Sequence, residues 1–215
     1  MTFNIEKYLE IKEFIKNFNT KRNINIVVVS KTHQLTAVKE ALRAGVRNFG
    51  EIRVNEAIEK FKILKKEHED LKLHMIGGLQ TNKTKKAMEI FDFFHSLDRE
   101  SLALEFSKHK ELLINKSFFI QVNTGNEIQK SGINIDYASD FVNYCTLDLK
   151  LNIIGLMCLP PFEEDPKKHF MLLNDIANKN NLKHLSMGMS ADYKIALNCG
   201  ASFIRIGSTL FGERK

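Results

Sequence analysis

The sequence predicts a closed (β/α)₈ barrel of the α/β class, and three observations lead to this prediction. Segments rich in β-branched and aromatic residues alternate with helical patterns, which is typical of parallel strands joined by right-handed crossovers. Eight such strand candidates fall within about 180 residues, and eight parallel strands are the number that closes this barrel. The first candidate is followed by "SKTHQL" rather than by the glycine-rich fingerprint of an open dinucleotide-binding sheet.

The strand candidates are short apolar runs, and the first one shows the pattern most clearly. Ile26 to Val29 form an unbroken run of β-branched residues, which indicates a strand buried on both faces. The eight predicted strands span residues 24–30, 46–49, 72–76, 91–95, 117–122, 151–157, 183–186 and 202–206.

The predicted helices are segments whose apolar residues recur with helical spacing. One of them is an additional helix that precedes the first strand. Gly45 and Gly200 follow two of the helices, where a left-handed cap is expected. The predicted helices span residues 2–18, 34–44, 52–69, 82–89, 99–110, 134–145, 164–180 and 190–198.

The composition narrows the function classes. The chain has 215 residues, of which 43% are hydrophobic and 27% charged, and no linker interrupts it, so we expect one domain over residues 1–215. Three cysteines without C-x-x-C spacing, and histidines without ligand spacing, predict neither disulfides nor a metal site. The net charge of +6 comes from lysines scattered over predicted helix faces, so nucleic-acid binding is not expected. These lysines are Lys60, Lys62, Lys65, Lys66, Lys83, Lys85, Lys86, Lys167 and Lys168.

No targeting or membrane signal is visible in the sequence. The N-terminal segment is amphipathic and mixed in charge, unlike a signal peptide, and no apolar run approaches the roughly 20 residues of a membrane span. Since no heptad pattern or apolar stripe argues for assembly, we expect a cytoplasmic monomer that does not bind membranes.

The predicted strand ends are polar or rich in glycine, and function in such barrels lies at the carboxyl ends of the strands. One rim should therefore gather a lysine, an arginine, several hydroxyl groups and several glycines. In chain order these ends are Ser30-Lys31-Thr32, Gly50-Glu51, Gly77-Gly78, His95-Ser96, Asn123-Thr124, Met157-Cys158, Met187-Gly188 and Arg205-Ile206-Gly207-Ser208.

The last two strand ends predict a phosphate site. Ser190 stands before a helical pattern as its expected N-cap, and a helix N-terminus also binds phosphate. Gly188 would let the backbone approach a ligand closely. Gly207 and Ser208 follow the eighth strand, in a loop that commonly binds phosphate in these barrels. Ser190 alone could be only a cap, but two separate stretches converge on one anion pocket.

Lys31 stands at the end of the first strand, across the rim from this pocket. A lysine there could simply be solvated, but lysine amines also form Schiff bases with carbonyl compounds. Pyridoxal 5′-phosphate (PLP) carries both an aldehyde and a phosphate, so a barrel with these two features suits it. Arg205 could then donate to an unprotonated pyridine nitrogen, which makes the ring a poorer electron sink than an aspartate partner would.

Eight segments together resemble the pyridoxal-phosphate homeostasis protein family, in order and over nearly the full chain. They are "VVVSKT", "GVRNFGEIRVNEAIEK", "LHMIGGLQTNK", "FFHSLD", "IQVNTGNEIQKSGI", "IIGLMCLPPF", "LSMGMSADYKIAL" and "FIRIGSTLFGERK". Three positions depart from the usual family pattern: Ile52 stands where the family has asparagine, Gly78 where it has histidine or proline, and Cys158 where it has threonine or serine.

The resemblance implies a barrel of the alanine racemase N-terminal type with PLP on Lys31. It places the phosphate and pyridine contacts at Ser190, Arg205, Gly207 and Ser208. It also implies a role in intracellular vitamin B6 homeostasis without established turnover, that is, a carrier rather than an enzyme. Amino acids as further ligands, and PLP-dependent apo-enzymes as transient partners, are expected on the same basis.

The alternative function is an amino-acid racemase on the same barrel. Racemisation by two bases needs a second acid or base, often a tyrosine, yet all four tyrosines fall inside predicted helices. Racemases of this type also carry a β-rich domain, which is not expected after Lys215. A binding module for phosphorylated metabolites would leave Lys31 unexplained. Lys130 is either a second functional lysine or a solvated loop residue, and His95 is expected to be a hydrogen-bonded residue at a strand end.

Overall fold

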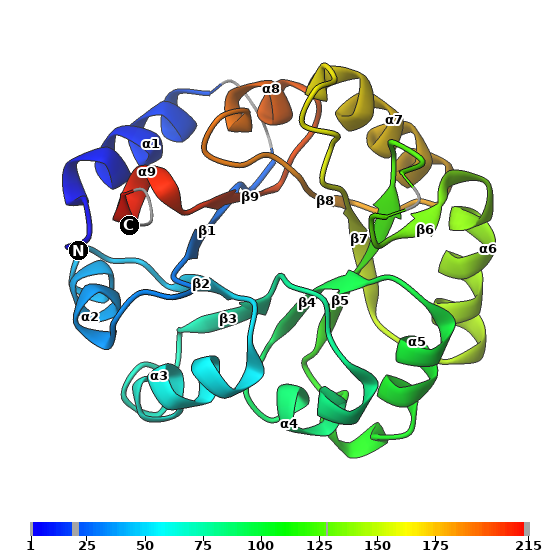
Figure 1. The fold of residues 1–215 in the computed structure, drawn as a ribbon, viewed down its shortest axis with the longest axis horizontal. Coiled ribbons are helices and arrows are strands. Elements are labelled where there is room, and N and C mark those ends of the chain that lie inside the picture. The colour runs from blue at the N-terminus through cyan, green and yellow to red at the C-terminus, as the bar shows by residue number, and fades with distance from the viewer. Residues whose placement is uncertain (1, 19–21, 128, 213–215) are drawn as a thin grey trace.

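Eight parallel strands close into a barrel that is surrounded by helices (Figure 1). The computed structural model describes residues 2–18, 22–127 and 129–212. The strands pair in the order β4-β3-β2-β1-β9-β8-β7-β5, and β4 also pairs with β5, which closes the ring. The prediction of a (β/α)₈ barrel with an additional N-terminal helix is therefore confirmed. The barrel strands are β1 (Asn25–Val29), β2 (Asn48–Glu51), β3 (Lys72–Met75), β4 (Phe93–Leu97), β5 (Ser117–Asn123), β7 (Ile153–Met157), β8 (His184–Ser186) and β9 (Phe203–Ile206).

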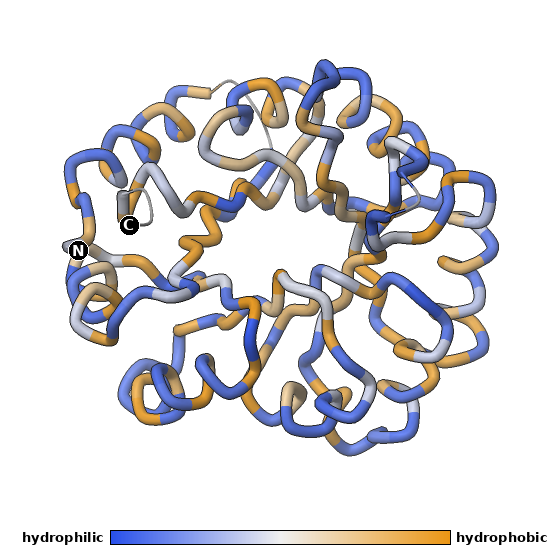
Figure 2. Tube along the Cα trace, viewed as in Figure 1, coloured by the Kyte–Doolittle hydropathy of each residue, from blue (hydrophilic) through white to orange (hydrophobic). Residues whose placement is uncertain are grey.

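The helices lie outside this ring, with their apolar faces toward the strands (Figures 1 and 2). Gly45 and Gly200 have φ angles of 88° and 106° directly after α2 and α8, so both predicted glycine caps are confirmed. The α-helices are α1 (Ile5–Asn17), α2 (Leu35–Arg43), α3 (Val54–Glu67), α4 (Thr84–Met88), α5 (Glu100–Ser107), α6 (Ala138–Asn143), α7 (Pro166–Lys179), α8 (Tyr193–Asn198) and α9 (Ser208–Phe211). None of the helices in the described part of the chain is long and apolar enough to cross a membrane.

Three predicted strands begin two residues too early. Val46, Phe91 and Leu151 were included in strands, but they lie in the segments that precede β2, β4 and β7, where their buried side chains pack into the outer core. An apolar turn residue has the same sequence signal as the first residue of a strand. As a result, Gly50-Glu51 and His95-Ser96 lie within strands rather than beyond them.

The segment predicted as a helix over residues 134–145 is divided into shorter elements. A two-residue strand, β6 (Ile133–Asn134), pairs with the end of β5, and a 3₁₀ turn (Ile135–Tyr137) precedes α6. The helical path then continues as a π-helical turn (Tyr144–Asp148). Asn134 explains the late start, because its side chain accepts a hydrogen bond from the amide of Asp136 and caps the 3₁₀ turn.

Side chains on the strands alternate between the interior of the barrel and the layer under the helices. Val27, Phe119, Met157 and Phe203 form an inner cluster, whereas Val28 and Ile204, their neighbours in sequence, belong to the larger outer core. The alternation fixes which residues reach the mouth of the barrel. On β1 the inward series from Val27 continues to Val29 and then to Lys31, and on β9 the series from Phe203 continues to Arg205 and Gly207.

The N-terminal helix α1 packs beside α9, so the two ends of the described chain meet on one side of the barrel (Figure 1). The amide of Asn4 donates to the carbonyl of Leu210 over 2.8 Å, and the rings of Phe3 and Phe211 are 5.4 Å apart. This contact holds the short helix that directly follows β9.

Candidate functional site

A cavity of about 630 Å³ opens at the carboxyl ends of β1, β8 and β9. Lys31, Ser190, Arg205, Gly207 and Ser208 all line it, so the structure brings the five predicted site residues together. Their roles in binding stay predictions. The remaining lining residues, most of which the sequence reasoning did not assign to a site, are Val29, His33, Ile52, Ile76, Leu159, Met189, Ala191 and Gly212.

A second hollow, of about 670 Å³, lies outside the barrel between α7 and α8, against residues such as Met171 and Asn198. It contains none of the predicted site residues, and it does not touch a strand end. Because the polar groups of this barrel converge at the other cavity, we take the rim cavity as the candidate site.

The turn that carries Lys31 is held by the ammonium group of Lys60 on α3. The Nζ atom of Lys60 donates to the carbonyl oxygen of Ser30 at 2.7 Å and approaches the carbonyl oxygen of His33 at 3.4 Å. It thus spans the turn from Ser30 to His33. Thr32 takes a left-handed φ of 67° in this turn, and its amide donates to Oε1 of Glu56. Contacts of this kind are needed to keep a non-glycine residue in such a conformation.

Two carboxylates complete this clamp around Lys60. The Nζ atom lies 2.6 Å from Oε1 of Glu51 and 2.9 Å from Oε1 of Glu56. Glu51 is fully buried, and its Oε1 also accepts from the hydroxyl of Ser30 at 2.7 Å. Burial raises the pKa of Glu51, and the charge and hydrogen bond of Lys60 oppose that rise.

The expectation that Lys60 is a surface lysine is wrong. Its side chain is 8% exposed, and the residue lies on the buried stripe of α3 that also contains Val54, Ala57, Phe61 and Leu64. That stripe is the signal that could have found it, because a lysine at a core position of an amphipathic helix needs a buried partner.

The two loops predicted to bind phosphate do meet. Oγ of Ser190 lies 3.5 Å from the amide nitrogen of Thr209 in the first turn of α9. Gly207 occupies the N-cap position of α9, and Ser208 is its first residue. The first amides of a helix have no acceptor within the helix, so this end offers N–H groups beside two serine hydroxyls.

The structure differs from the phosphate prediction in two details. Ser190 is not the N-cap of α8, because the helix begins at Tyr193 with Asp192 at the N-cap position. The carboxylate of Asp192 accepts from the amide of Met189 at 2.6 Å, which turns the chain before the helix can start. Gly188 does not line the cavity, and packing accounts for its glycine: it has a φ of 89°, and a Cβ there would lie 2.5 Å from Cβ of Ala196.

Arg205 is a buried cation at the floor of the cavity. Its Nη1 donates to Oγ of Ser186 at 2.7 Å, and its Nη2 donates to the carbonyl oxygen of Cys158 at 3.0 Å. Burial lowers the pKa of Arg205, although a guanidinium group stays charged at neutral pH. It has five N–H donors, so these two contacts leave donors for a ligand. The contact at Cys158 is made by the main chain, so the departure from the family pattern there does not remove it.

Two buried histidines lie inside the barrel below Arg205. His95 does not stand at a strand end as expected; it lies within β4 and is fully buried. Its Nδ1 is 2.7 Å from Oγ of Ser186, and its Nε2 is 2.9 Å from Nδ1 of His74. Burial lowers the pKa of His74 to about 3 and that of His95 well below its usual value, so both rings are neutral at pH 7.

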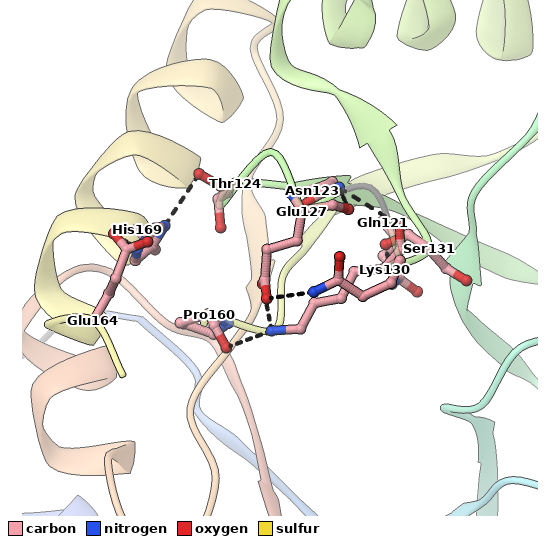
Figure 3. Close-up of polar contacts among 10 residues, drawn as sticks. Gln121, Asn123, Thr124, Glu127, Lys130, Ser131, Pro160, Glu164 and His169 are labelled. Carbon is pink, nitrogen blue, oxygen red and sulfur yellow. Dashed lines mark hydrogen bonds and ion pairs between the residues drawn. The ribbon is translucent and has the colours of Figure 1, made fainter. Parts of the chain in front are cut away.

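Lys130 does not line the cavity but joins two loops of the rim (Figure 3). Its Nζ lies 2.6 Å from Oε2 of Glu127 and 3.3 Å from the carbonyl oxygen of Pro160. Its side chain is 34% exposed. These contacts support a structural role, in which Lys130 ties the loop after β5 to the loop after β7.

Comparisons with known proteins agree with the geometry. The family described as alanine racemase, N-terminal domain, matches residues 10–215. A pyridoxal phosphate homeostasis protein of Aquifex aeolicus is 39% identical over 197 residues, which cover 86% of this chain and 85% of that protein. The protein of the same name from Vibrio cholerae is 34% identical, over 90% of this chain and 87% of its own.

Solved structures show the same relationship. PipY of Synechococcus elongatus, solved without PLP, superposes with a TM-score of 0.87 at 32% identity, covering 97% of this chain and 99% of its own. The same protein with PLP bound gives 0.82 at 29% identity over the same shares. Alanine racemase of Corynebacterium glutamicum, with a TM-score of 0.69 and 11% identity over 97% of this chain and 60% of its own, shares the fold alone. The resemblance that the sequence motifs indicated is confirmed.

Replacing Lys60 should destabilise the protein strongly. In Lys60→Met, the buried carboxylate of Glu51 loses its cation, and its second oxygen, Oε2, already has no hydrogen-bond partner among the described residues. We expect the free energy of unfolding to fall by about 3–5 kcal/mol, measured by urea denaturation. Lys62→Met, on the exposed face of the same helix, is the matched control and should stay within about 0.5 kcal/mol. Equal midpoints for the two variants would contradict the clamp.

The buried histidines should make stability depend on pH. Their pKa values are lowered in the folded state, so below about pH 6.5 the unfolded chain takes up protons that the folded chain does not. The contribution of the two neutral histidines to the free energy of unfolding is thus fully present above that pH. It falls as the pH decreases, by about 1.4 kcal/mol per pH unit for each histidine. Urea denaturation of His95→Gln between pH 6 and 5 should show a slope smaller by that amount. A slope equal to that of the unmodified protein would contradict the buried neutral state of His95.

Proposed function

The chain belongs to the alanine racemase N-terminal domain family and, within it, to the pyridoxal phosphate homeostasis proteins, and from this premise we propose that it binds PLP at the rim cavity and carries it without catalytic turnover. One observation carries the proposal: a single cavity is lined by an amine, a guanidinium group and the start of a helix with two serine hydroxyls. These are the partners that an aldehyde, a pyridine nitrogen and a phosphate require.

The residues of the cavity fit this cofactor in size and in chemistry. A volume of about 630 Å³ lies within the range of small-molecule sites. Lys31 lies in the loop after β1, and Ser208 begins the helix α9 after the adjacent strand β9, so an amine and an anion site face one ligand. When bound, PLP supplies an electrophilic aldehyde and an electron-withdrawing ring.

Each polar residue has one role in this proposal. Lys31 contributes its amine to a Schiff base, and the clamp around Lys60 fixes the turn from which that amine projects. Ser190, Gly207 and Ser208 bind the phosphate through hydroxyl groups and helix amides. Arg205 donates an N–H group to the pyridine nitrogen and, being a permanent cation, does not hand that nitrogen a proton.

The carrier function is favoured over racemisation by what lines the cavity. All four tyrosines lie in the described part of the chain, at Tyr8, Tyr137, Tyr144 and Tyr193, and none of them lines it. His33 does line it, but it follows Lys31 by two residues on the same turn. Two-base racemisation needs proton carriers on opposite faces of the substrate. Arg205 also offers less carbanion stabilisation than a carboxylate partner would.

Lys31 is half-buried at the mouth of the cavity, and this position suits loading and release. An incoming amine, including that of an amino acid, reaches it from solvent. The proposal therefore extends to transient PLP-dependent apo-enzymes as recipients and to a part in vitamin B6 homeostasis. We also propose that the protein is a monomer, that it lies in the cytoplasm, and that it forms one domain over residues 1–215.

Borohydride reduction tests the assignment of the amine. Reduction of the PLP-loaded protein should fix the cofactor to the peptide that contains Lys31, as read by mass spectrometry. Lys31→Ala should lose the visible absorption of the imine. Lys130→Ala, which changes a lysine of the same rim that does not line the cavity, should keep both signals. A label on any other lysine, or imine absorption in Lys31→Ala, would contradict the assignment.

The phosphate pocket is tested by comparing PLP with pyridoxal. A phosphate held by several charge-assisted hydrogen bonds, each worth roughly 1.5–3 kcal/mol, should make PLP bind at least a hundredfold more tightly. Ser208→Ala should weaken PLP by about tenfold and leave pyridoxal unchanged, as measured by fluorescence titration. Equal affinities for the two ligands would show that the phosphate is not the anchor.

A further inference from the structure

Five polar side chains form a continuous hydrogen-bonded series across the interior of the barrel. Beginning at the cavity, Nη1 of Arg205 is 2.7 Å from Oγ of Ser186, which is 2.7 Å from Nδ1 of His95. Nε2 of His95 is 2.9 Å from Nδ1 of His74, whose Nε2 is 3.0 Å from Oδ1 of Asn48. The residues come from five strands, β9, β8, β4, β3 and β2.

The chemistry of the two ends gives the series one direction. A guanidinium group can only donate, so Oγ of Ser186 accepts from Arg205. An amide oxygen can only accept, so Nε2 of His74 carries a proton and donates to Asn48. A neutral imidazole has one donor and one acceptor, so Nδ1 of His74 accepts from Nε2 of His95. Nδ1 of His95 is then left to accept the hydroxyl proton of Ser186.

The direction depends on both imidazoles being neutral, and their surroundings favour that state. The ring of Phe93 stacks on His74 with centroids 4.4 Å apart, and the ring of Phe119 stacks on His95 at the same separation. Both histidines are fully buried, and Arg205 supplies a positive charge at the end of the series. A protonated ring there would be desolvated and repelled by that charge. The stacked phenylalanines also restrict the rotation of both rings.

We propose that Ser186, His95 and His74 are positioning residues, which form a one-directional hydrogen-bond chain that fixes the guanidinium group of Arg205 toward the ring nitrogen of the bound cofactor. This inference rests on the proposed function, because it takes Arg205 to be the partner of the pyridine nitrogen. An arginine side chain loses several rotatable bonds on being fixed, and a serine with a defined hydroxyl direction holds it in one geometry. The hydrogen-bond chain thereby keeps the pyridine nitrogen of the cofactor hydrogen-bonded to Arg205 and unprotonated.

The direction of the chain can be tested without any ligand. Two-dimensional ¹H–¹⁵N NMR of the histidine side chains in the cofactor-free protein should show both His74 and His95 as neutral rings with the proton on Nε2. A proton on Nδ1 of either ring, or a charged ring at pH 7, would overturn the one-directional chain.

The effect on Arg205 is tested with PLP labelled with ¹⁵N in its ring. Ser186→Ala removes the hydroxyl that joins Arg205 to His95, and we expect PLP to bind about tenfold more weakly, as for the loss of one hydrogen bond to a charged group. The ¹⁵N resonance of the ring should also move toward that of an unprotonated pyridine without a donor. Ser202→Ala is the matched control, because Ser202 is a buried serine of the same region that bonds Leu185 and His184 instead. It should change neither signal.

Two further variants separate positioning from general structural damage. His95→Gln keeps an acceptor and a donor and should retain PLP affinity within about threefold, since no hydrogen bond of a charged group is lost. In an Arg205→Gln background, Ser186→Ala should have no further effect on the ring resonance. An undiminished effect in that background, or no effect of Ser186→Ala alone, would overturn the inference. Failure of the unmodified protein to bind PLP would overturn the proposed function itself. The histidine spectra are recorded on the cofactor-free protein, so they test the direction of the hydrogen-bond chain independently of PLP binding.

Discussion

The geometry of the rim depends on the buried ammonium group of Lys60. It lies against two carboxylates and the carbonyl of Ser30 within 2.9 Å, at the turn where β1 ends. A turn with a left-handed threonine would otherwise relax into several conformations, and the amine of Lys31 would move with it. The ion pair is a costly way to fix a turn, because burying two charges needs nearly ideal partners. Its position beneath the amine that we assign to the cofactor explains why the fold tolerates that cost.

The opposite side of the cavity is held by packing rather than by charge. The helix α1 lies against α9, with the amide of Asn4 bonded to Leu210 and the ring of Phe3 beside that of Phe211. The amides at the start of α9 therefore stay at a constant distance from Ser190. An anion site made of helix amides loses little entropy when its ligand binds only if these amides are already in place. The additional N-terminal helix thus contributes to the site without touching the cavity.

The fold could be predicted from the sequence because strands and helices have different periods, and the barrel follows from their order. Lys31, Arg205, Gly207 and Ser208 were found for a related reason, since the carboxyl ends of parallel strands meet at one rim. Lys60 was missed because it was grouped with the other lysines of a charged helix, although its position on the apolar stripe of α3 distinguishes it from them. Ser190 was wrongly predicted to be the N-cap of α8, because the hydrogen bond that the amide of Met189 donates to Asp192 depends on the three-dimensional turn. His74 and His95 stand out as polar residues in apolar runs, but the bond of His95 to Ser186 spans 91 residues of sequence and appears only when the barrel closes.

The carrier function is the central claim, and the fate of the α-hydrogen of an amino acid tests it most directly. The PLP-loaded protein would be incubated with single L-amino acids in deuterated water, and deuterium at the α-carbon would be followed by NMR and mass spectrometry. Cofactor transfer to a PLP-dependent apo-enzyme would be measured in parallel as recovered activity. The account predicts transfer without α-exchange above the level given by free PLP. Deuterium incorporation over many turnovers per protein molecule would contradict it and would identify a racemase.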